Sequence, residues 1–279
     1  MDLSVIIVSW KVKDKLRGNL EALRKSVGDF KFEVIVIDND SQDGTIEMVA
    51  NEFMEVKLIS NEVNRGFAAA NNQGIKISQG KYVLLLNPDM RVEPDTLSKM
   101  LNWMDVNPLA TVAGCQLVNE EGKIVEQVRR FPKLRDQLAI VFKLPHIFKS
   151  VNNKYLCAGF DYARPVKVDS IRGAFFLISR ERFKLISGGR EPLLDERYFI
   201  WFEEVDFCKT VYQLGGEVWY TPAARCLDYV GQSFKQVKRG QTQRYFSESM
   251  LKYFAKWGNR LATVALRLAW RLVLIFLPK

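Results

Sequence analysis

The sequence predicts an α/β fold, with a mixed but mainly parallel sheet flanked by helices. Short apolar segments alternate with helical patterns from the first residues onward, as in proteins built from βαβ units. Several apolar segments end in polar or acidic residues, where ligands bind in open α/β sheets. The 279 residues, 48% of them hydrophobic, are enough for one enzyme-sized domain, although length alone would also allow two.

The first two strands and the helix between them have clear patterns. Residues 3–10 and 32–37 are apolar runs, and leucines at helical spacing mark the segment 14–25. A polar loop rich in carboxylates, residues 38–44, leads into a helix at about 45–52. This order of elements predicts a βαβ unit.

The next elements extend the same alternation. A third strand is expected at 56–60, and a glycine turn precedes a helix of small residues at 67–78, whose amino end could face an anion. The apolar run 82–86 predicts a buried parallel strand, with Asp89 just beyond it. Because crossovers between parallel strands share one hand, we expect the strand ends along one edge, at Trp10, Asp38, Ser60 and Asn87.

The second half contains fewer clear elements. A strand, a short helix and another strand are expected at 171–179, 180–185 and 217–220. The aromatic segment 198–208 includes Glu203, Glu204 and Asp206. Acids at the amino end of a helix are explained by the helix dipole. An apolar wall beside a carboxylate also raises its pKa, which suits a general base, so the residues leave both explanations open.

Five segments, in this order along the chain, resemble the motifs of family 2 inverting glycosyltransferases, and most of all those of the rhamnosyltransferase-like branch. They are residues 5–10, 36–45, 64–74, 85–89 and 202–208. The resemblance implies the GT-A fold, with a nucleotide-sugar half at 1–118 and an acceptor half at 119–250. It also implies transfer of rhamnose or a similar hexose to a hydroxyl of a lipid-linked or polysaccharide acceptor.

The resemblance also assigns the donor site. In such enzymes the ends of the first two strands and the helix after the glycine turn hold the nucleotide sugar. The corresponding residues here are Ser9, Trp10, Asp38, Asn39, Asp40, Arg65, Asn71 and Asn87. A deoxythymidine diphosphate sugar is the expected donor, and a uridine diphosphate sugar is the alternative. Without the family pattern, Asp38 is equally well explained as a turn residue at a strand end.

A divalent cation, Mg²⁺ or Mn²⁺, follows from the same resemblance. Asp89 takes the position of its ligand, and one or two protein carboxylates are enough because the diphosphate supplies further oxygens. Relatives usually carry histidines near Asp228 and Tyr229, and this chain has none there. Either Asp228 replaces a histidine as a hard oxygen ligand, or that metal contact is lost.

The general base also departs from the family pattern. Relatives usually have glutamate and aspartate where this chain has Glu203 and Glu204, and the second acid deprotonates the acceptor hydroxyl. Glutamate at this position is one methylene longer. We assign the base to Glu204, with Glu203 and Asp206 as alternatives.

The carboxyl-terminal segment, 251–279, predicts one long basic amphipathic helix. One stripe carries Lys256, Arg260, Arg267 and Arg271, and the opposite face carries Leu261, Ala265, Leu268, Leu272 and Phe276. Arginines interrupt it, and it is too short for a clear bilayer span. We expect it to lie on the anionic inner face of the cell membrane. Packing on the catalytic domain and a truncated membrane segment are the alternatives.

The remaining features narrow the class of protein. The formal charge of +9 indicates an acidic partner or surface, but the sequence has no nucleic-acid-binding signature. The turn after the first strand lacks the glycines of a dinucleotide site. The four cysteines, without zinc spacing, and the absence of a signal peptide favour a cytoplasmic protein.

Three further expectations concern His146, the segment 131–165 and the alternative function. His146 is expected at the surface or in packing, and the segment 131–165 is either a mobile loop or an ordered insertion. A catalytically impaired binding or scaffold protein of a glycan assembly complex remains the alternative function.

Overall fold

The computed structural model describes residues 1–148, 150–229 and 239–275. Its first half begins with β1 (Leu3–Ser9), α1 (Lys13–Arg24) and β2 (Phe32–Asn39). It continues through α2 (Thr45–Glu52), β3 (Lys57–Asn61), α3 (Phe67–Ile77) and β4 (Tyr82–Leu86). Each element lies within two residues of its predicted bounds, because the apolar periodicity of this half is strong.

The first four strands run parallel and end along one edge of the sheet. Ser9 in β1 is level with Asp38 in β2, and Asp38 is level with Ser60 in β3. Leu85 in β4 pairs with Ile6 in β1, so β4 ends at the same edge. The predicted meeting of the strand ends is therefore confirmed.

From residue 90 onward the structure contains several elements that the sequence pattern did not predict. They begin with β5 (Met90–Val92), α4 (Thr96–Val106), β6 (Ala110–Val118) and β7 (Val128–Arg129). Next come α5 (Leu134–Val141), the 3-10 helix η1 (Leu144–His146), β8 (Val166–Lys167) and β9 (Ser170–Ile171). The segment 131–165 thus contains α5 and η1, and His146 is exposed.

Three elements expected between residues 171 and 220 are present with changed bounds, namely β10 (Phe175–Ser179), α6 (Arg180–Ser187) and β11 (Glu217–Asp228). The helix α7 (Glu203–Gln213) begins at the first of the three acids. The strand expected at 171–179 is divided, because residues 172–174 form a turn between β9 and β10. The strand expected at 217–220 continues to Asp228.

Within the described residues nine strands form one sheet in the order β3-β2-β1-β4-β10-β6-β11-β5, with β8 beside β11, and β7 pairs with β9 in a separate two-stranded sheet. The strand β10 is antiparallel to both β4 and β6, while β11 is parallel to β6. Most strands therefore point the same way, and β5, β8 and β10 point the opposite way. This mixed α/β sheet confirms the predicted fold class.

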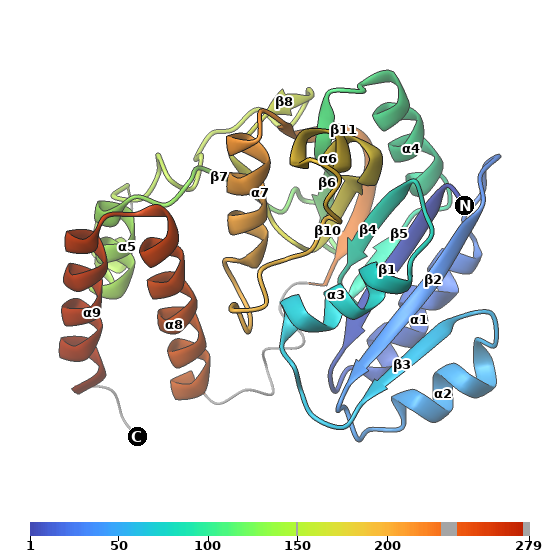
Figure 1. Ribbon diagram of the computed structural model, residues 1–279, viewed down its shortest axis with the longest axis horizontal. Helices are drawn as coiled ribbons and strands as arrows, with labels where there is room; N and C mark the ends of the chain where they lie inside the picture. The colour runs from blue at the N-terminus through green and yellow to red at the C-terminus, as the bar shows by residue number, and fades with distance from the viewer. Residues whose placement is uncertain (149, 230–238, 276–279) are drawn as a thin grey trace.

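Helices cover both faces of the sheet (Figure 1). Alternate residues of a strand point to opposite faces, so Val5 and Ile7 contact the side covered by α1, α2 and α4. Ile6 and Val8 contact the side covered by α3, α6 and α7. A Cβ on Gly74 of α3 would lie 2.6 Å from Cγ2 of Ile6. Glycine thus allows α3 to lie directly on the strands.

The carboxyl-terminal segment forms two helices, α8 (Arg239–Trp257) and α9 (Arg260–Ile275), so the prediction of one long helix is wrong. The helix breaks at Gly258, and Asn259 caps α9 by accepting a hydrogen bond from the Ala262 amide at 2.7 Å. The predicted domain boundary at residues 250 and 251 falls inside α8.

Together with α5, these helices form a lobe beside the sheet (Figure 1). Its apolar core includes Met250 and Tyr253 of α8 and Leu266 and Trp270 of α9. In the part of the chain that the structure describes, no helix is both long and apolar enough to cross a bilayer. The predicted position of Phe276 lies outside the described residues.

Candidate active site

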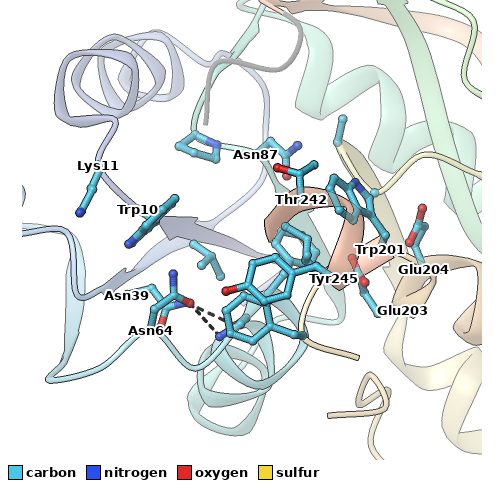
Figure 2. Close-up of a pocket in the computed structure, with 18 of the residues that line it drawn as sticks. Trp10, Lys11, Asn39, Asn64, Asn87, Trp201, Glu203, Glu204, Thr242 and Tyr245 are labelled. Atoms are coloured by element: carbon cyan, nitrogen blue, oxygen red, sulfur yellow. Dashed lines mark hydrogen bonds between the residues drawn. The ribbon is translucent and has the colours of Figure 1, made fainter. Parts of the chain in front are cut away.

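A cavity of about 730 Å³ opens at the edge where β1, β2 and β4 end, within the size range of small-molecule sites. Trp10 and Lys11 lie on one side of it, and Glu203 and Glu204 lie on the other (Figure 2). Its walls also include the start of α3, the turn before β10 and the start of α8. The cavity therefore joins segments from both halves of the chain.

Four of the predicted donor residues line this cavity, namely Trp10, Asn39, Asp40 and Asn87. Two others, Ser9 and Asp38, are buried at the ends of β1 and β2. The Oγ of Ser9 and the Oδ1 of Asp38 have no hydrogen-bond partner among the described residues. Buried polar atoms rarely stay unpaired, so this edge has unused hydrogen-bonding capacity.

Asp38 was expected either to bind the donor or to close a turn, and its two carboxylate oxygens are compatible with both roles. Its Oδ2 accepts a hydrogen bond from the Ser41 amide at 3.1 Å and closes a turn, while its Oδ1 stays unpaired. Loss of solvation raises the pKa of this carboxyl. The turn role therefore uses one oxygen and leaves the other available.

Asn39 holds the glycine turn against the strand ends. Its Oδ1 accepts hydrogen bonds from Asn61 Nδ2 at 3.1 Å and from the Arg65 amide at 3.0 Å. Its Nδ2 donates to Asn64 Oδ1 at 2.9 Å. Gly66 has φ of 82°, and a Cβ there would lie 2.5 Å from the carbonyl oxygen of Phe199. Only glycine fits this approach.

The remaining two predicted donor residues do not line the cavity. The side chain of Arg65 is exposed. Asn71 is buried in α3, where its Nδ2 donates to the carbonyl oxygen of Phe67 at 2.9 Å. Sequence reasoning missed their neighbour Asn72, which bonds the backbone of Leu194 through both its amide nitrogen and its oxygen, at 2.8 Å each.

Glu203 and Glu204 begin α7 and both line the cavity. Glu203 is buried and Glu204 is half-buried, and the Oε2 of each lacks a hydrogen-bond partner in the described structure. Burial raises the pKa of both carboxyls, and the neighbouring Glu204 raises that of Glu203 further. A raised pKa makes a carboxylate a stronger base, which suits a proton acceptor.

The backbone just before these acids has an uncommon conformation. Trp201 has φ of 63° and Phe202 has φ of 69°, in the left-handed region that non-glycine residues rarely adopt. Such strain is often found at functional sites, where the surrounding structure enforces it. Here Trp201 lines the cavity, and the turn places both glutamates at its wall.

Asp206 lies one turn further along α7 and is engaged by three donors. Its Oδ1 accepts from Tyr198 Oη at 3.1 Å and from Trp257 Nε1 at 2.6 Å. Its Oδ2 accepts from Lys256 Nζ at 2.7 Å. It does not line the cavity. The geometry therefore favours a structural role for Asp206, which joins α7 to α8.

Asp89 lies in the turn just before β5, and Asp228 is the last residue of the neighbouring strand β11. Neither residue is part of the cavity lining. Asp228 is level with Met90 in the pairing of β11 with β5, and both carboxylates are buried. The Oδ2 of Asp228 accepts from Nη1 of Arg172 at 3.1 Å. No group of three or more acidic, histidine or cysteine ligands occurs among the described residues. Two carboxylates still suit a cation that also binds diphosphate oxygens and water.

Sequence reasoning missed several residues of the cavity wall. Arg172 stands in the turn between β9 and β10, and Lys11 follows β1. The start of α8 adds Gln241, Thr242 and Tyr245. The ring of Tyr245 stacks on Phe199, with centroids 4.5 Å apart. No local pattern connects these segments, which are far apart in the sequence.

Comparisons with known proteins agree with this architecture. The model of the family Glycosyl transferase family 2 matches residues 4–181. Rhamnosyltransferase WbbL of Escherichia coli (strain K12) is 26% identical over 261 residues, which are 90% of this chain and 92% of that protein. N-acetylglucosaminyl-diphospho-decaprenol L-rhamnosyltransferase of Mycobacterium tuberculosis (strain ATCC 25618 / H37Rv) is 24% identical over 244 residues, covering 83% and 77% of the two chains.

A solved structure resembles the whole fold. Mannosyltransferase PcManGT from Pyrobaculum calidifontis, in complex with GDP-Man and Mn²⁺, matches with a TM-score of 0.58 at 15% identity. The match covers 99% of this chain and 76% of that one, and it supports the predicted GT-A fold. Since the family model extends over more than half of the sequence, the chain belongs to glycosyl transferase family 2.

Proposed function

We propose that this protein is a metal-dependent inverting glycosyltransferase. It transfers rhamnose or a similar hexose from a nucleotide diphosphate to a hydroxyl of a lipid-linked or polysaccharide acceptor. The observation that carries the proposal is the cavity itself, where the strand ends of the nucleotide-binding half face Glu204, whose Oε2 has no hydrogen-bond partner among the described residues. Two chemically different sides suit a reaction between two substrates.

The nucleotide binds at the side formed by Trp10, Asn39 and Asp40. The indole of Trp10 offers a flat surface for a base or ribose, and the unpaired oxygens of Ser9 and Asp38 lie just behind this wall. Both rhamnosyltransferase relatives support rhamnose as the sugar. We propose a deoxythymidine diphosphate donor, with a uridine diphosphate donor as the alternative.

The acceptor binds at the side formed by the start of α8 and the segment before α7. Aromatic rings line it, at Phe199, Trp201 and Tyr245, and flat apolar surfaces suit the faces of sugar rings. The name of the mycobacterial relative describes an acceptor linked to a lipid through a diphosphate. We propose an acceptor of that class.

Asp89 and Asp228 would hold Mg²⁺ or Mn²⁺ together with the donor diphosphate. The bound ion would offset the negative charge that grows on the diphosphate as it leaves. The Mn²⁺ in the mannosyltransferase complex supports this proposal. Asp228 must then give up its ion pair with Arg172.

Glu204 takes the proton of the acceptor hydroxyl. The hydroxyl oxygen attacks the anomeric carbon from the side opposite the diphosphate, so the new glycosidic bond forms as the bond to the phosphate oxygen breaks. The configuration of that carbon is inverted. Glu204 suits this role better than Glu203, because it is the less buried of the two.

The test is nucleotide binding and turnover across a panel of nucleotide sugars with Mg²⁺ or Mn²⁺. Glu204→Gln should lower kcat by about 100- to 10,000-fold, as expected for a lost general base, while the donor still binds. Asp89→Asn should weaken metal-dependent donor binding. Glu121→Gln, at an exposed surface ion pair, is the matched control and should change neither.

Two results would contradict the proposal. If no nucleotide sugar binds with either metal, the assignment is wrong. If donors bind but neither hydrolysis nor transfer occurs in the unaltered protein, the scaffold alternative is favoured instead. The ion pair between Asp228 and Arg172 is the observation consistent with that alternative, because it occupies a candidate metal ligand.

The helix α9 is the proposed membrane contact. One face packs into the lobe through Ala262, Leu266 and Trp270. A second face is exposed and apolar, with Leu261, Val264, Leu268 and Leu272 between 49% and 80% exposed. Exposed arginines lie along its edge, at Arg260, Arg267 and Arg271. An apolar stripe beside arginines fits the surface of an anionic bilayer.

Packing on the rest of the chain and contact with a membrane were alternative expectations for this segment, and different faces of α9 suit each of them. The helix packs on the rest of the chain, but through residues other than the predicted apolar face. Leu261, Leu268 and Leu272 of that predicted face remain exposed. The first residues after η1, Ile147 and Phe148, are also exposed, at 72% and 62%, and they follow α5, which packs on α9.

Flotation with phospholipid vesicles tests this contact. The protein should float with vesicles that contain phosphatidylglycerol and much less with pure phosphatidylcholine. The triple change Leu261→Ser, Leu268→Ser and Leu272→Ser should abolish flotation without altering nucleotide binding. Leu185→Ser, at a leucine of α6 that is 72% exposed, serves as the control. Equal flotation of the triple variant would exclude α9 as the contact.

A further inference from the structure

Arg172 links the candidate metal site to the cavity. Its Nη1 lies 3.1 Å from Oδ2 of Asp228, which is 3% exposed, while one third of the Arg172 side chain is exposed. The same side chain lines the cavity. Arg172 therefore connects a buried carboxylate with the wall of the cavity.

The turn that carries Arg172 is fixed on both sides. The Arg172 amide donates to the carbonyl oxygen of Gln127 at 3.1 Å. The carbonyl oxygen of Ala174 accepts from the Asn87 amide at 3.0 Å. Between them, Gly173 faces Glu204, with the position of a Cβ only 3.6 Å from the Glu204 Cβ. The backbone is held, so the long side chain is the part that can turn.

A guanidinium and a divalent cation compete for the same carboxylate. Both are positively charged, and like charges a few ångströms apart repel each other strongly away from water. Arginine also binds phosphate through two parallel hydrogen bonds. A donor diphosphate in the cavity therefore offers Arg172 a second partner when a metal ion takes Asp228.

We propose that Arg172 is a resident counter-ion that exchanges partners, holding Asp228 in the free protein and the donor diphosphate when a divalent cation binds. This inference rests on the proposed function. It predicts that metal and nucleotide bind cooperatively. A metal ion on Asp228 releases Arg172 for the diphosphate, and a diphosphate that binds Arg172 releases Asp228 for the metal. Arg172 also moves positive charge toward the leaving diphosphate and keeps the carboxylate neutralised before the substrates arrive.

The position of Arg172 beside the base agrees with this assignment. Its positive charge lowers the pKa of Glu204, against the larger rise that burial causes. Of the cavity-lining residues in the described ranges, Lys11 and Arg172 are the cationic ones. Lys11 lies on the nucleotide side (Figure 2), so it supplies a natural control for the charge of the cavity.

The experiment measures binding rather than turnover. Binding of Mn²⁺ alone is followed by electron paramagnetic resonance, and binding of UDP and dTDP, with and without Mn²⁺, by calorimetry. In the unaltered protein, Mn²⁺ should tighten nucleotide binding about 5- to 150-fold, the usual range for coupled sites. In Arg172→Gln, Mn²⁺ alone should bind more tightly, and the nucleotide complex should weaken.

Two further variants make the result specific. Lys11→Gln should weaken nucleotide binding without strengthening Mn²⁺ binding. The pair Arg172→Gln with Asp228→Asn removes both charges, so it guards against misfolding from an unpaired buried carboxylate. This pair should lose the gain in Mn²⁺ affinity that Arg172→Gln produces, since the carboxylate is no longer there.

The inference is overturned if Arg172→Gln leaves Mn²⁺ affinity and metal–nucleotide coupling unchanged while the unaltered protein binds nucleotide. That outcome leaves the proposed function intact. Failure of the unaltered protein to bind any nucleoside diphosphate would instead remove the proposed function, and this inference with it.

Discussion

At the scale of single residues, two adjacent acids have different environments. Glu203 is 4% exposed, whereas Glu204 is half-buried and packs beside Gly173. Burial raises the pKa of both, and the raised value of Glu203 also reflects its charged neighbour. Glu204 is the base proposed above, whereas no chemical step is proposed for the more buried Glu203.

Glu203→Gln should therefore stabilise the fold at neutral pH. The folded-state pKa of Glu203 is raised above its ordinary value of 4.5, so the carboxyl destabilises the fold only as pH rises through and above that value. Each unit of the rise corresponds to about 1.4 kcal/mol. Urea denaturation at pH 4 and pH 8 checks this. The gain should appear at pH 8 and vanish near pH 4, and a gain independent of pH would contradict it.

At the scale of elements, the glycine turn before α3 depends on one contact. The Phe67 amide donates to the carbonyl oxygen of Phe199 at 2.6 Å, directly beside Gly66. This bond attaches the donor-side turn to the segment that leads into α7. Correct placement of Trp201 and the two glutamates thus depends on a backbone contact between the two halves of the chain.

Gly66→Ala should destabilise the protein and weaken nucleotide binding. Gly66 has φ of 82° and ψ of 169°, a region that essentially only glycine adopts, and the new Cβ would also overlap the carbonyl oxygen of Phe199. Gly122→Ala is the matched control, because Gly122 has φ of 74° with no atom within 4 Å of the added Cβ. Thermal denaturation should show a larger loss at Gly66. Equal losses would mean that the contact with Phe199 is unimportant.

Asp206→Asn should weaken the attachment of α8 to α7 and lower the free energy of unfolding. It weakens the charged hydrogen bonds from Lys256 and Trp257, so we expect a loss of about 2–3 kcal/mol in unfolding free energy. Asp14→Asn, which removes an exposed pair with Arg17, should change stability by less than about 1 kcal/mol. Denaturant titration compares the two, and similar values would argue against a structural role for Asp206.

The sequence predicted the elements up to residue 86 well and the later elements poorly. Strands β1 to β4 are buried parallel strands with a strong apolar pattern, whereas β5, β7, β8 and β9 are only two or three residues long. The helix break at Gly258 has too weak a local signal against the apolar periodicity around it. Bonds between α7 and α8 join residues about 50 positions apart, so no local pattern indicates that Asp206 is occupied.

The candidate site follows the same division. Trp10, Asn39 and Asp40 stand at the ends of parallel strands, where chemistry is expected, and they line the cavity. Arg172, in contrast, stands in a turn that was expected to be part of a strand. Its importance arises from Asp228, 56 positions away, which only the folded chain brings close.

At the scale of the whole molecule, part of the excess positive charge lies on the helix proposed to contact the membrane. Exposed arginines of α9 flank its apolar stripe, so attraction to an anionic membrane should be screened by salt. Raising sodium chloride from 0.05 to 0.5 M should therefore reduce, but not abolish, flotation with phosphatidylglycerol vesicles, since the leucines still insert. Flotation insensitive to salt would argue for a purely apolar contact.

The break at Gly258 places α8 beside α9, and this arrangement determines how far the cavity would lie from a membrane under α9. Packed helices have axes about 8–10 Å apart. Figure 1 shows α8 beside α9, and the start of α8 forms a wall of the cavity. On the membrane contact proposed above, the hairpin would therefore act as a spacer that holds this wall about one helix diameter from the bilayer surface.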